Sequence, residues 1–443
     1  MWGNENIWSK PDSSRRIKYW ARGFAIASLV HLCLPDFEQP GWRAPQILEA
    51  LGAVLLLWRP SPWAFLLCAL STLYPLLFLR DVLTQSMYLT WVAFVAAFGS
   101  FGLRLDVLSC VRWLTAGTYL LAAFHKLNHD FLNPEFSCAH HALRQMDAYW
   151  SLIPFPMGLG VSLSIAVVVI EILICILLLR RSLWVWPIGA VFHWGLTVTL
   201  APAFGLVMLA GYASALTANH LVLIRATWRR HLKSIVCLTG ALLCLDSVFS
   251  GTLASVGQMI KGIMILGSAV VALFVLGTHH ARLRRRIPSK CRIAMVFGLL
   301  WLAHGLLPYF GVKYQHSAAM LSNLRIDKPC YNSLIMPTFV GEHDPYVRVL
   351  RARIGRGQRP RREQILTDGL WTPTAMSVMH KNWCIPELRP ILIEGDYRGR
   401  AFTISDLCER RWYEPLGFTQ PPWSGLQRFQ KNLKARCETA CIH

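Results

Sequence analysis

The sequence has little charge and, in particular, few acidic residues. Only 16% of its 443 residues are Asp, Glu, Lys or Arg, whereas about 25% is usual for soluble domains. Asp and Glu number 24 against 45 Lys and Arg, which leaves a formal net charge of +21. This composition argues against an ordinary soluble domain. No nucleic-acid-binding motif accompanies the positive charge, so we expect no nucleic-acid partner.

The chain also lacks internal repeats, low-complexity segments and any Asn-x-Ser/Thr glycosylation sequon. These absences argue against a repeat array and against a compositionally biased, disordered chain. The polar stretch MWGNENIWSKPDSSRRIKYW has no small-residue cleavage site after the first apolar run. We therefore expect an uncleaved first segment.

Apolar residues, in contrast, are abundant. They make up 54% of the chain, and 18 residues are Trp, which is enriched at bilayer interfaces. Since an apolar run of about 18 to 20 residues can cross a bilayer, the sequence predicts a mainly α, polytopic membrane helix bundle with about 9–11 transmembrane helices. The candidate spans are residues 17–34, 46–58, 61–79, 86–103, 107–124, 160–179, 183–200, 203–224, 234–252, 262–278 and 293–310.

The loop charges orient these spans, because Lys and Arg concentrate in cytoplasmic loops. Cations gather in alternate loops, at 10–18, 59, 104–112, 180–181, 225–233 and 279–292. Eleven spans with a cytoplasmic N-terminus satisfy this alternation, or nine if two segments are re-entrant. The loop 125–159 and everything after about residue 311 would then lie outside, in the periplasm, the extracellular space or a lumen. We thus expect an integral, multi-pass protein with the lipid bilayer as its partner.

Two domains follow from this topology. Residues 1–310 would form the transmembrane domain with the outer loop 125–159, and residues 311–443 an extramembrane region packed over the outer face. Within that region RVLRARIGRGQRPRREQ is strongly basic and must be solvated, and ELRPILIEGDYRGRAF alternates apolar and polar residues between turn formers. This pattern is typical of short strands, so we expect a small α/β or mostly β fold.

Six cysteines fall on the predicted outer side, which is the side where disulfides persist. An even number favours at least one bridge, with free thiols as the alternative; the pairing stays open. A bridge from the outer loop to the C-terminal region would hold that region over the loop. The six are Cys138, Cys330, Cys384, Cys408, Cys437 and Cys441.

The stretch LLAAFHKLNHDFLNPEFSCA (120–139) places ionisable residues at the end of an apolar segment. Desolvation there favours the neutral amine of Lys126, which is the form that acts as a general base. His125 and His129 are four apart and share a helix face, and Asp130 adds a carboxylate. We predict these four residues as catalytic and Asn128 as a binding residue. The alternative is a lysine that extends its head to the lipid headgroups.

The same loop supports a rival interpretation as a metal-dependent membrane oxidase, because His140 and His141 follow and paired histidines suit metal ions. A second histidine box is missing from that side, since His279 and His280 fall on the opposite side in the predicted topology. We therefore expect no metal.

A second polar group follows the last predicted span, in LPYFGVKYQHSAAMLSNLRIDKPCYNSLIMP (307–337). Arg325 is of the type that holds a carboxylate or polarises a carbonyl. We predict a substrate- or cofactor-binding role for its polar side chains, with an ordinary interfacial segment as the alternative. They are Tyr314, His316, Ser317, Asn323 and Arg325.

The stretch AAFHKLNHDFLNPEFSCA resembles the motif of bacterial membrane proteins with the HTTM domain, the family that includes vitamin K-dependent γ-carboxylase. The family's catalytic lysine falls on Lys126, and Leu127 and Asp130 also match. After the last span, Ser317, Met320 and Arg325 fit the family pattern. The first lysine of the family's pair is His125 here, and a family aspartate is Asn128. The resemblance covers roughly residues 15–340.

This resemblance implies a membrane enzyme in which Lys126 deprotonates a reduced quinone of the vitamin K hydroquinone or menaquinol type. Oxygen would then generate a strong base that abstracts a C–H proton, and carbon dioxide would trap the carbanion of a peptide or small-molecule substrate. Such chemistry needs a dry site. His125, His129 or His316 would stabilise the developing oxyanion.

Other functions stay open. One is a non-carboxylating HTTM protein that matures an exported peptide or acts as a quinone-linked oxidoreductase. Another, from a different class, is a transporter or a structural membrane partner. Glu171 and Asp246 lie inside predicted spans, where a carboxylate is functional or paired, and the resemblance points to Arg22 as a partner for either.

Overall fold

The computed structural model describes most of the chain. The described residues are 11–32, 43–78, 84–101, 106–149, 157–182, 184–199, 204–216, 226, 229–230, 233, 237, 291–312, 314, 317–319, 321–340, 344–355, 360–417, 433–437 and 441. The predicted spans 234–252 and 262–278 lie outside them, as do Asp246, His279, His280, His316 and Met320.

The chain divides into two compact units. The helical unit comprises residues 1–123 and 142–303, and the C-terminal unit comprises 124–141 and 304–443. The first part of the outer loop therefore belongs with the C-terminal region, and the boundary on the C-terminal side falls at residue 304. Each unit is described separately below.

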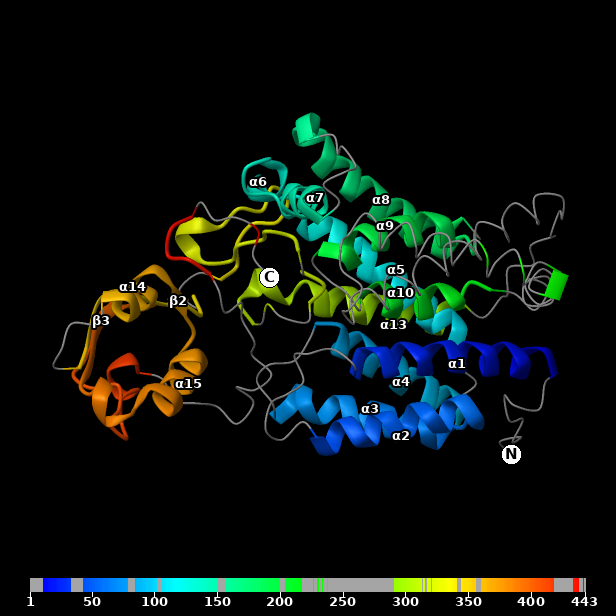
Figure 1. Ribbon diagram of the computed structural model, residues 1–443, viewed down its shortest axis with the longest axis horizontal. Coiled ribbons are helices and arrows are strands. Elements are labelled where there is room, and N and C mark those ends of the chain that lie inside the picture. Colours follow the sequence, from blue (N-terminus) through cyan, green and yellow to red (C-terminus); the bar gives the residue numbers. More distant parts are fainter. Residues whose placement is uncertain are drawn as a thin grey trace. The chain divides into compact units, whose positions relative to one another are not determined.

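The helical unit is built from apolar helices that pack in sequence order (Figure 1). Helix α1 contacts α2 and α10, α2 contacts α3, α3 contacts α4, and α9 contacts both α8 and α10. Their bounds are α1 Pro11–Leu32, α2 Arg43–Trp58, α3 Pro62–Phe78, α4 Thr84–Ser100, α5 Val107–His125, α7 Cys138–Tyr149, α8 Val161–Leu179, α9 Val185–Thr199, α10 Phe204–Ala213 and α13 Cys291–Gly305. Helix α5 runs on into the C-terminal unit, and α7 begins in it.

Every predicted span except the two outside the described residues contains one of these helices. Two described helices, α5 and α8, are long and apolar enough to cross a membrane, which indicates membrane association. Four of the others are short: α2, α3, α4 and α13 have 16, 17, 17 and 15 residues, against the roughly 20 that a bilayer needs. The mainly helical class is thus confirmed, whereas the count of nine to eleven spans stays a prediction.

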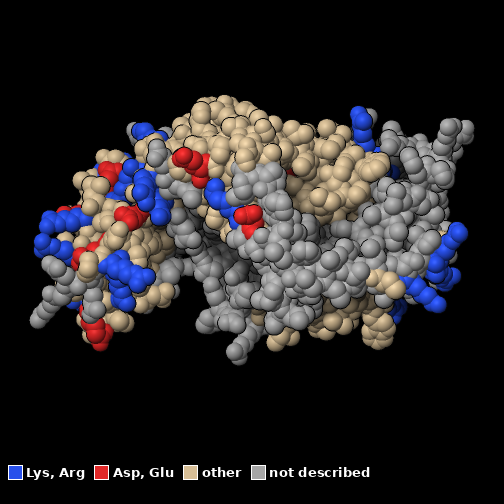
Figure 2. Space-filling view, turned by 45° about the horizontal axis from the view of Figure 1, so that its top comes forward, with Lys and Arg blue, Asp and Glu red and all other residues tan. Residues whose placement is uncertain are grey.

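Helix α8 shows why a membrane suits this unit. One face is buried and carries Ser164, Val168, Glu171, Ile174, Cys175 and Leu178. The opposite face leaves large apolar side chains exposed, among them Ile165, Val169 and Ile176. A soluble monomer rarely exposes such a continuous apolar surface. The described surface of the helical unit is accordingly poor in charge on the face shown in Figure 2.

The C-terminal unit contains the small sheet expected from the alternating sequence. Four antiparallel strands are ordered β2-β1-β3-β4, with β1 Val347–Ile354, β2 Leu370–Trp371, β3 Ile391–Tyr397 and β4 Arg400–Ile404. Strands β3 and β4 form a hairpin whose two loop residues, Arg398 and Gly399, both have positive φ. Such a loop matches the twist of the flanking strands. The helices α14 Pro360–Asp368 and α15 Pro373–Trp383 complete an α+β fold.

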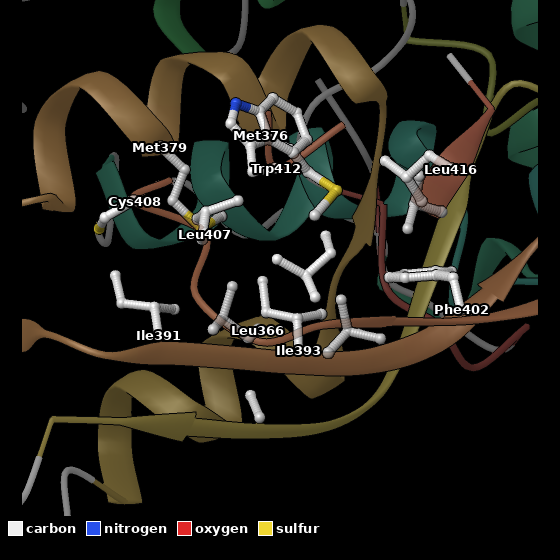
Figure 3. Close-up of a cluster of buried hydrophobic side chains, with 14 of the residues drawn as sticks. Leu366, Met376, Met379, Ile391, Ile393, Phe402, Leu407, Cys408, Trp412 and Leu416 are labelled. Atoms are coloured by element: carbon white, nitrogen blue, oxygen red, sulfur yellow. The ribbon is translucent and has the colours of Figure 1, made fainter. Parts of the chain in front are cut away.

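Alternate residues of the strands form the core of this fold. Ile391 and Ile393 point from β3 toward side chains from the helices and the following loops, including Leu366, Met376 and Trp412 (Figure 3). A disulfide between Cys384 and Cys408 closes this region. Around the sheet, Figure 2 shows cationic and anionic side chains interspersed, as expected for a solvated surface.

Gly395 in β3 is required by the close approach of the neighbouring strand. A Cβ atom there would lie 2.1 Å from the Arg348 carbonyl oxygen of β1. We expect Gly395→Ala to destabilise the sheet by about 3 kcal/mol, since backbone must move. The control is Gly399→Ala, where a Cβ meets nothing within 4 Å and only the positive φ is unfavourable, at about 1 kcal/mol. Thermal unfolding of the full chain measures both; equal midpoints would contradict the packing argument.

Candidate functional site

The predicted site lies where α5 ends, within the C-terminal unit. The chain turns after His125 and begins the short helix α6, His129–Leu132. Asn128 fixes this turn: its side-chain oxygen accepts from the Phe131 amide at 2.8 Å and so caps α6. Its amide nitrogen donates to the carbonyl oxygens of His125 at 2.7 Å and Ser322 at 2.6 Å. Asn128 therefore joins the turn to the second predicted segment and has a structural role.

His125 is fully buried and bonded through both ring nitrogens. Nε2 lies 3.1 Å from the Ser317 carbonyl oxygen and Nδ1 lies 3.0 Å from the Tyr309 hydroxyl. Since a carbonyl only accepts, Nε2 carries a proton, and in the neutral ring Nδ1 accepts from Tyr309. The two rings also stack, with centroids 5.5 Å apart. His125 thus positions the Ser317 backbone and the Tyr309 hydroxyl.

Lys126 is buried, with 4% of its surface exposed. Its Nζ lies 5.8 Å from the centroid of the Phe131 ring, within the range of a cation–π contact. An amine at the end of an apolar helix normally reaches solvent or lipid headgroups. The turn at Asn128 instead encloses Lys126, as the interpretation of this residue as a base requires.

The segment facing His125 has an unusual backbone. Ala318, Leu321 and Asn323 all have φ between 57° and 59°, a region that costs an L-residue about 1–2 kcal/mol. Strain of this kind is common at functional sites. Beside it, Ser317 is 1% exposed and its hydroxyl has no hydrogen-bond partner among the described residues. This buried hydroxyl is free to contact a bound molecule.

Two asparagines hold this segment against the turn after α5. Asn323 accepts from the Cys138 amide at 2.8 Å and donates to the Phe136 carbonyl at 2.9 Å. Asn332 donates to Asp130 Oδ2 and to the Asn323 carbonyl, both at 2.8 Å. Burial raises the pKa of Asp130, and the hydrogen bond from Asn332 opposes this effect. Asp130 and Asn323 therefore link this segment to the turn after α5.

Arg325 is completely buried and all five of its side-chain N–H donors are engaged. Nε and Nη2 bind the two oxygens of Asp327, each at 2.9 Å. The remaining donors bind the carbonyl oxygens of Lys434, Arg436 and Cys437 at 2.8, 2.6 and 3.2 Å. Arg325 was expected to hold a substrate carboxylate; in the structure it holds residues 434–437 instead.

The remaining predicted residues differ in their placement. Tyr314 is buried, and its hydroxyl donates to the Leu324 carbonyl at 2.9 Å; burial raises its pKa. His129 is exposed to solvent. His316 lies outside the described residues. The structure thus brings together His125, Asn128, Asp130, Ser317 and Asn323, with Lys126 enclosed in the same turn.

Disulfides complete the site. All six predicted outer cysteines are paired: Cys138 with Cys441, Cys330 with Cys437, and Cys384 with Cys408. The prediction of at least one disulfide is confirmed, and the pairing that had stayed open includes one bridge from the outer loop to the C-terminal region, Cys138–Cys441. Two of the three bridges involve Cys437 and Cys441, and the carbonyl oxygen of Cys437 is itself bound by Arg325.

Sequence reasoning missed Tyr309, Asn332 and Asp327. Tyr309 and Asn332 lie inside the stretch singled out, but their types are common at structural positions. Asp327 had a usable signal, because an Asp two residues from an Arg in an apolar segment suggests an ion pair. Among the residues that the structure describes, no group of three or more His, Cys, Asp or Glu side chains is arranged to hold a metal.

The helical unit contains a separate buried cluster. The Tyr119 hydroxyl bonds to His193 Nε2 and to the Tyr212 hydroxyl, and these come from α5, α9 and α10. Glu171 of α8 is within electrostatic range of both tyrosines. Arg22, expected to pair with Glu171, is exposed and donates to the Leu57 carbonyl at 3.2 Å. No Arg22–Glu171 ion pair occurs in the described part of the chain.

Comparisons with protein-family models, with curated proteins and with solved structures find no match to the chain. The resemblance to the HTTM family thus stays a prediction that depends on the residues around Lys126.

The Arg325–Asp327 pair predicts a strong effect on stability. Arg325→Leu leaves Asp327 buried beside only Arg348, whose Nη2 lies 3.6 Å from Oδ2, and we expect a loss of about 3–5 kcal/mol. Arg351→Leu is the control, because its ion pair with Glu394 spans 3.8 Å and its side chain is 58% exposed; a change under about 0.5 kcal/mol is expected. Chemical denaturation of both variants distinguishes them, and similar losses would disprove the role of the pair.

The raised pKa of Asp130 predicts that the stability of the protein depends on pH, with a defined sign. Because its folded-state pKa is raised, its stabilising contribution is present at low pH and lost as pH rises through that pKa. Asp130→Asn keeps an oxygen for Asn332 and removes the buried charge. We expect the variant's thermal midpoint to exceed wild type at pH 7, and the difference to vanish near pH 4. The charges of His129, Arg325 and Asp327 also affect the pKa of this carboxyl. These three residues are the same in wild type and in the variant. A pH-independent difference would contradict the prediction.

Proposed function

We propose that this protein is a multi-pass membrane enzyme, similar to vitamin K-dependent γ-carboxylase, in which Lys126 is the base. The observation that carries the proposal is the burial of Lys126 at the end of α5. The amine lies out of solvent beside the Phe131 ring, where a base for dry-site chemistry would have to lie. The substrate would be a peptide or small molecule bound outside the cytoplasm.

The residues around Lys126 fit a reduced quinone of the vitamin K hydroquinone or menaquinol type. Phe131 lies against Lys126, and Phe124 and Tyr309 pack edge to face with centroids 5.7 Å apart. These rings suit a planar aromatic headgroup, and the unpartnered Ser317 hydroxyl suits one of its oxygens. Such a cofactor supplies a weakly acidic hydroxyl and the electrons for oxygen-dependent proton abstraction.

Each residue has a defined task in this proposal. Lys126 would accept a proton from a hydroxyl of the bound cofactor and would keep the resulting positive charge beside it. Ser317 would donate a hydrogen bond to the same oxygen, as in an oxyanion hole. His125 holds the Ser317 carbonyl, and the turn closed by Asn128 would keep water away from the site.

The disulfides support the proposed orientation. All three bridges lie in the C-terminal unit, and disulfides persist outside the reducing cytosol. The free cysteines among the described residues, Cys68, Cys110, Cys175 and Cys237, lie in the helical unit. We therefore place the C-terminal unit in the periplasm, extracellular space or a lumen and the N-terminus in the cytoplasm.

The test is oxidation of reduced vitamin K or menaquinone by purified protein in detergent. The measured quantity is the formation of quinone or epoxide. For Lys126→Ala we expect turnover about 10²–10⁴-fold below wild type, the usual contribution of a general base. Added methylamine should restore part of it. His129→Ala is the matched control, because His129 is exposed three residues away, and it should retain activity.

Thermal midpoints show whether each variant is folded. Wild-type turnover that persists in Lys126→Ala would remove Lys126 as the base. Folded wild-type protein that oxidises no hydroquinone would overturn the cofactor assignment and favour peptide maturation, transport or a structural role. If turnover is found, labelled bicarbonate tests whether carboxylation accompanies it.

A further inference from the structure

Exposed apolar side chains gather in the C-terminal unit beside the candidate site. Their surfaces are between 41% and 53% exposed, and all of them belong to the same compact unit. We call these residues the apolar rim: Phe310, Val312, Leu334, Ile335 and Phe339. Large apolar side chains that are exposed together mark a surface for another molecule or for a membrane.

Two backbone segments carry the apolar rim, and both are bonded to residues of the candidate site. The Phe339 amide donates to the Tyr309 carbonyl, and the Leu334 amide donates to the Leu127 carbonyl, each at 3.0 Å. The rings of Phe310 and Phe339 stack with their centroids 5.1 Å apart. The two segments therefore lie against each other and against the turn that follows α5.

The second of these segments has an inner and an outer side. Met336 packs inward, against the core cluster that contains Tyr309, and Phe124 packs against the same cluster. Leu334 and Ile335, which precede Met336 directly, are exposed. The segment thus covers aromatic residues of the candidate site with one side and presents apolar side chains outward with the other.

The apolar rim also lacks charge. The stretches GLLPYFGV (305–312) and SLIMPTFV (333–340) contain no Asp, Glu, Lys or Arg. Leu350 of β1 is exposed as well, at 73%, but its neighbour Arg351 pairs with Glu394 on the charged surface of the sheet. The rim is therefore suited to an apolar partner, whereas Leu350 lies in a surface suited to water.

The chain leads directly from a predicted membrane span to the apolar rim. Helix α13 exposes Ile293, Val296 and Leu300, which are spaced so as to lie on one side of the helix. It ends at Gly305, and the five residues from there to Phe310 can span at most about 18 Å. If α13 crosses the bilayer, the rim lies within that distance of the membrane surface.

We propose that the apolar rim is inserted into the outer leaflet of the bilayer, so that its partner is lipid hydrocarbon near the membrane surface. The inference rests on the membrane placement of the proposed function and extends it to a unit otherwise assigned to the aqueous side. Because the rim is bonded to Leu127 and Tyr309, the candidate site would lie beside the lipid. A cofactor with an apolar tail would then reach the site from the bilayer without crossing water.

The experiment measures which solvent surrounds the rim in the full chain, reconstituted in phosphatidylcholine nanodiscs. An environment-sensitive fluorescent amino acid is placed in turn at Val312, at Ile335 and, as the control, at Leu350. One quencher is a phosphatidylcholine with a nitroxide on its acyl chain, and the other is iodide in water. We expect the nitroxide lipid to quench at Val312 and Ile335 and iodide to quench at Leu350.

Two exposed apolar residues give a matched pair of variants. With the fluorophore at Val312, we expect Ile335→Asp to reduce quenching by the nitroxide lipid by about half or more, because a carboxylate is unfavourable in hydrocarbon. Leu350→Asp makes a similar change on the sheet and should leave the quenching unchanged. Leu334 is the second position for the fluorophore, for use if the label at Val312 prevents folding.

Three results would overturn the proposal. Iodide quenching at Val312 and Ile335 equal to that at Leu350 would place the rim in water. Protection from both quenchers would mean that protein, such as a second copy of the chain, covers it. Equal effects of Ile335→Asp and Leu350→Asp would show that the rim does not depend on lipid contact.

None of these measurements requires turnover. Lipid contact at the rim without oxidation of any hydroquinone would therefore leave this inference in place and overturn only the cofactor assignment. Oxidation of hydroquinone by a protein whose rim lies in water would do the reverse.

Discussion

The candidate site depends on one buried ion pair, Arg325 with Asp327. A guanidinium taken out of water is unfavourable unless each of its donors finds an acceptor. Here Asp327 supplies two and the backbone of residues 434–437 supplies three. The pair therefore fixes a backbone that is not in a regular helix or strand. The amide of Arg325 itself is bound by Asn332, which also holds Asp130 and Asn323. Through these contacts one charge pair connects the turn after α5, the strained segment 318–323 and the C-terminal segment.

Much of the local structure followed from sequence patterns. The apolar runs predicted helices, the alternating stretch at 387–402 predicted short strands where β3 and β4 lie, and six cysteines predicted at least one disulfide. The sequence also identified the two segments that form the site. The helices, strands and site segments depend on residues close together in the chain, and the disulfide prediction depends on the number of cysteines. The number of membrane spans stays a prediction, because two of the predicted spans lie almost wholly outside the described residues and the described lengths of α2, α3 and α4 are below the length that a bilayer needs.

Individual roles were harder to predict because they depend on contacts between distant residues. Arg325 has the chemistry of a carboxylate receptor, and only the positions of Asp327 and the carbonyls of 434–437 show that its donors are already used. His129 shares a helical spacing with His125, but the chain turns at Asn128 and leaves His129 in solvent. Conversely, Tyr309 was not predicted, and the sequence pattern singled out Ser317 without placing it near His125. Both lie beside His125 because the chain returns after α13, about 190 residues later.

The bridges Cys138–Cys441 and Cys330–Cys437 have a consequence for biosynthesis. They join cysteines that are 303 and 107 residues apart in the chain, and the acceptors of Arg325 at 434–437 lie in the same later-made segment. While the chain is growing, the guanidinium has no complete set of partners and the turn around Lys126 has no bridge to hold it. The contacts around Lys126 are therefore complete only after Cys437 and Cys441 have been made and both bridges have formed. Assembly of this region is thus a late step of folding, and it depends on oxidation.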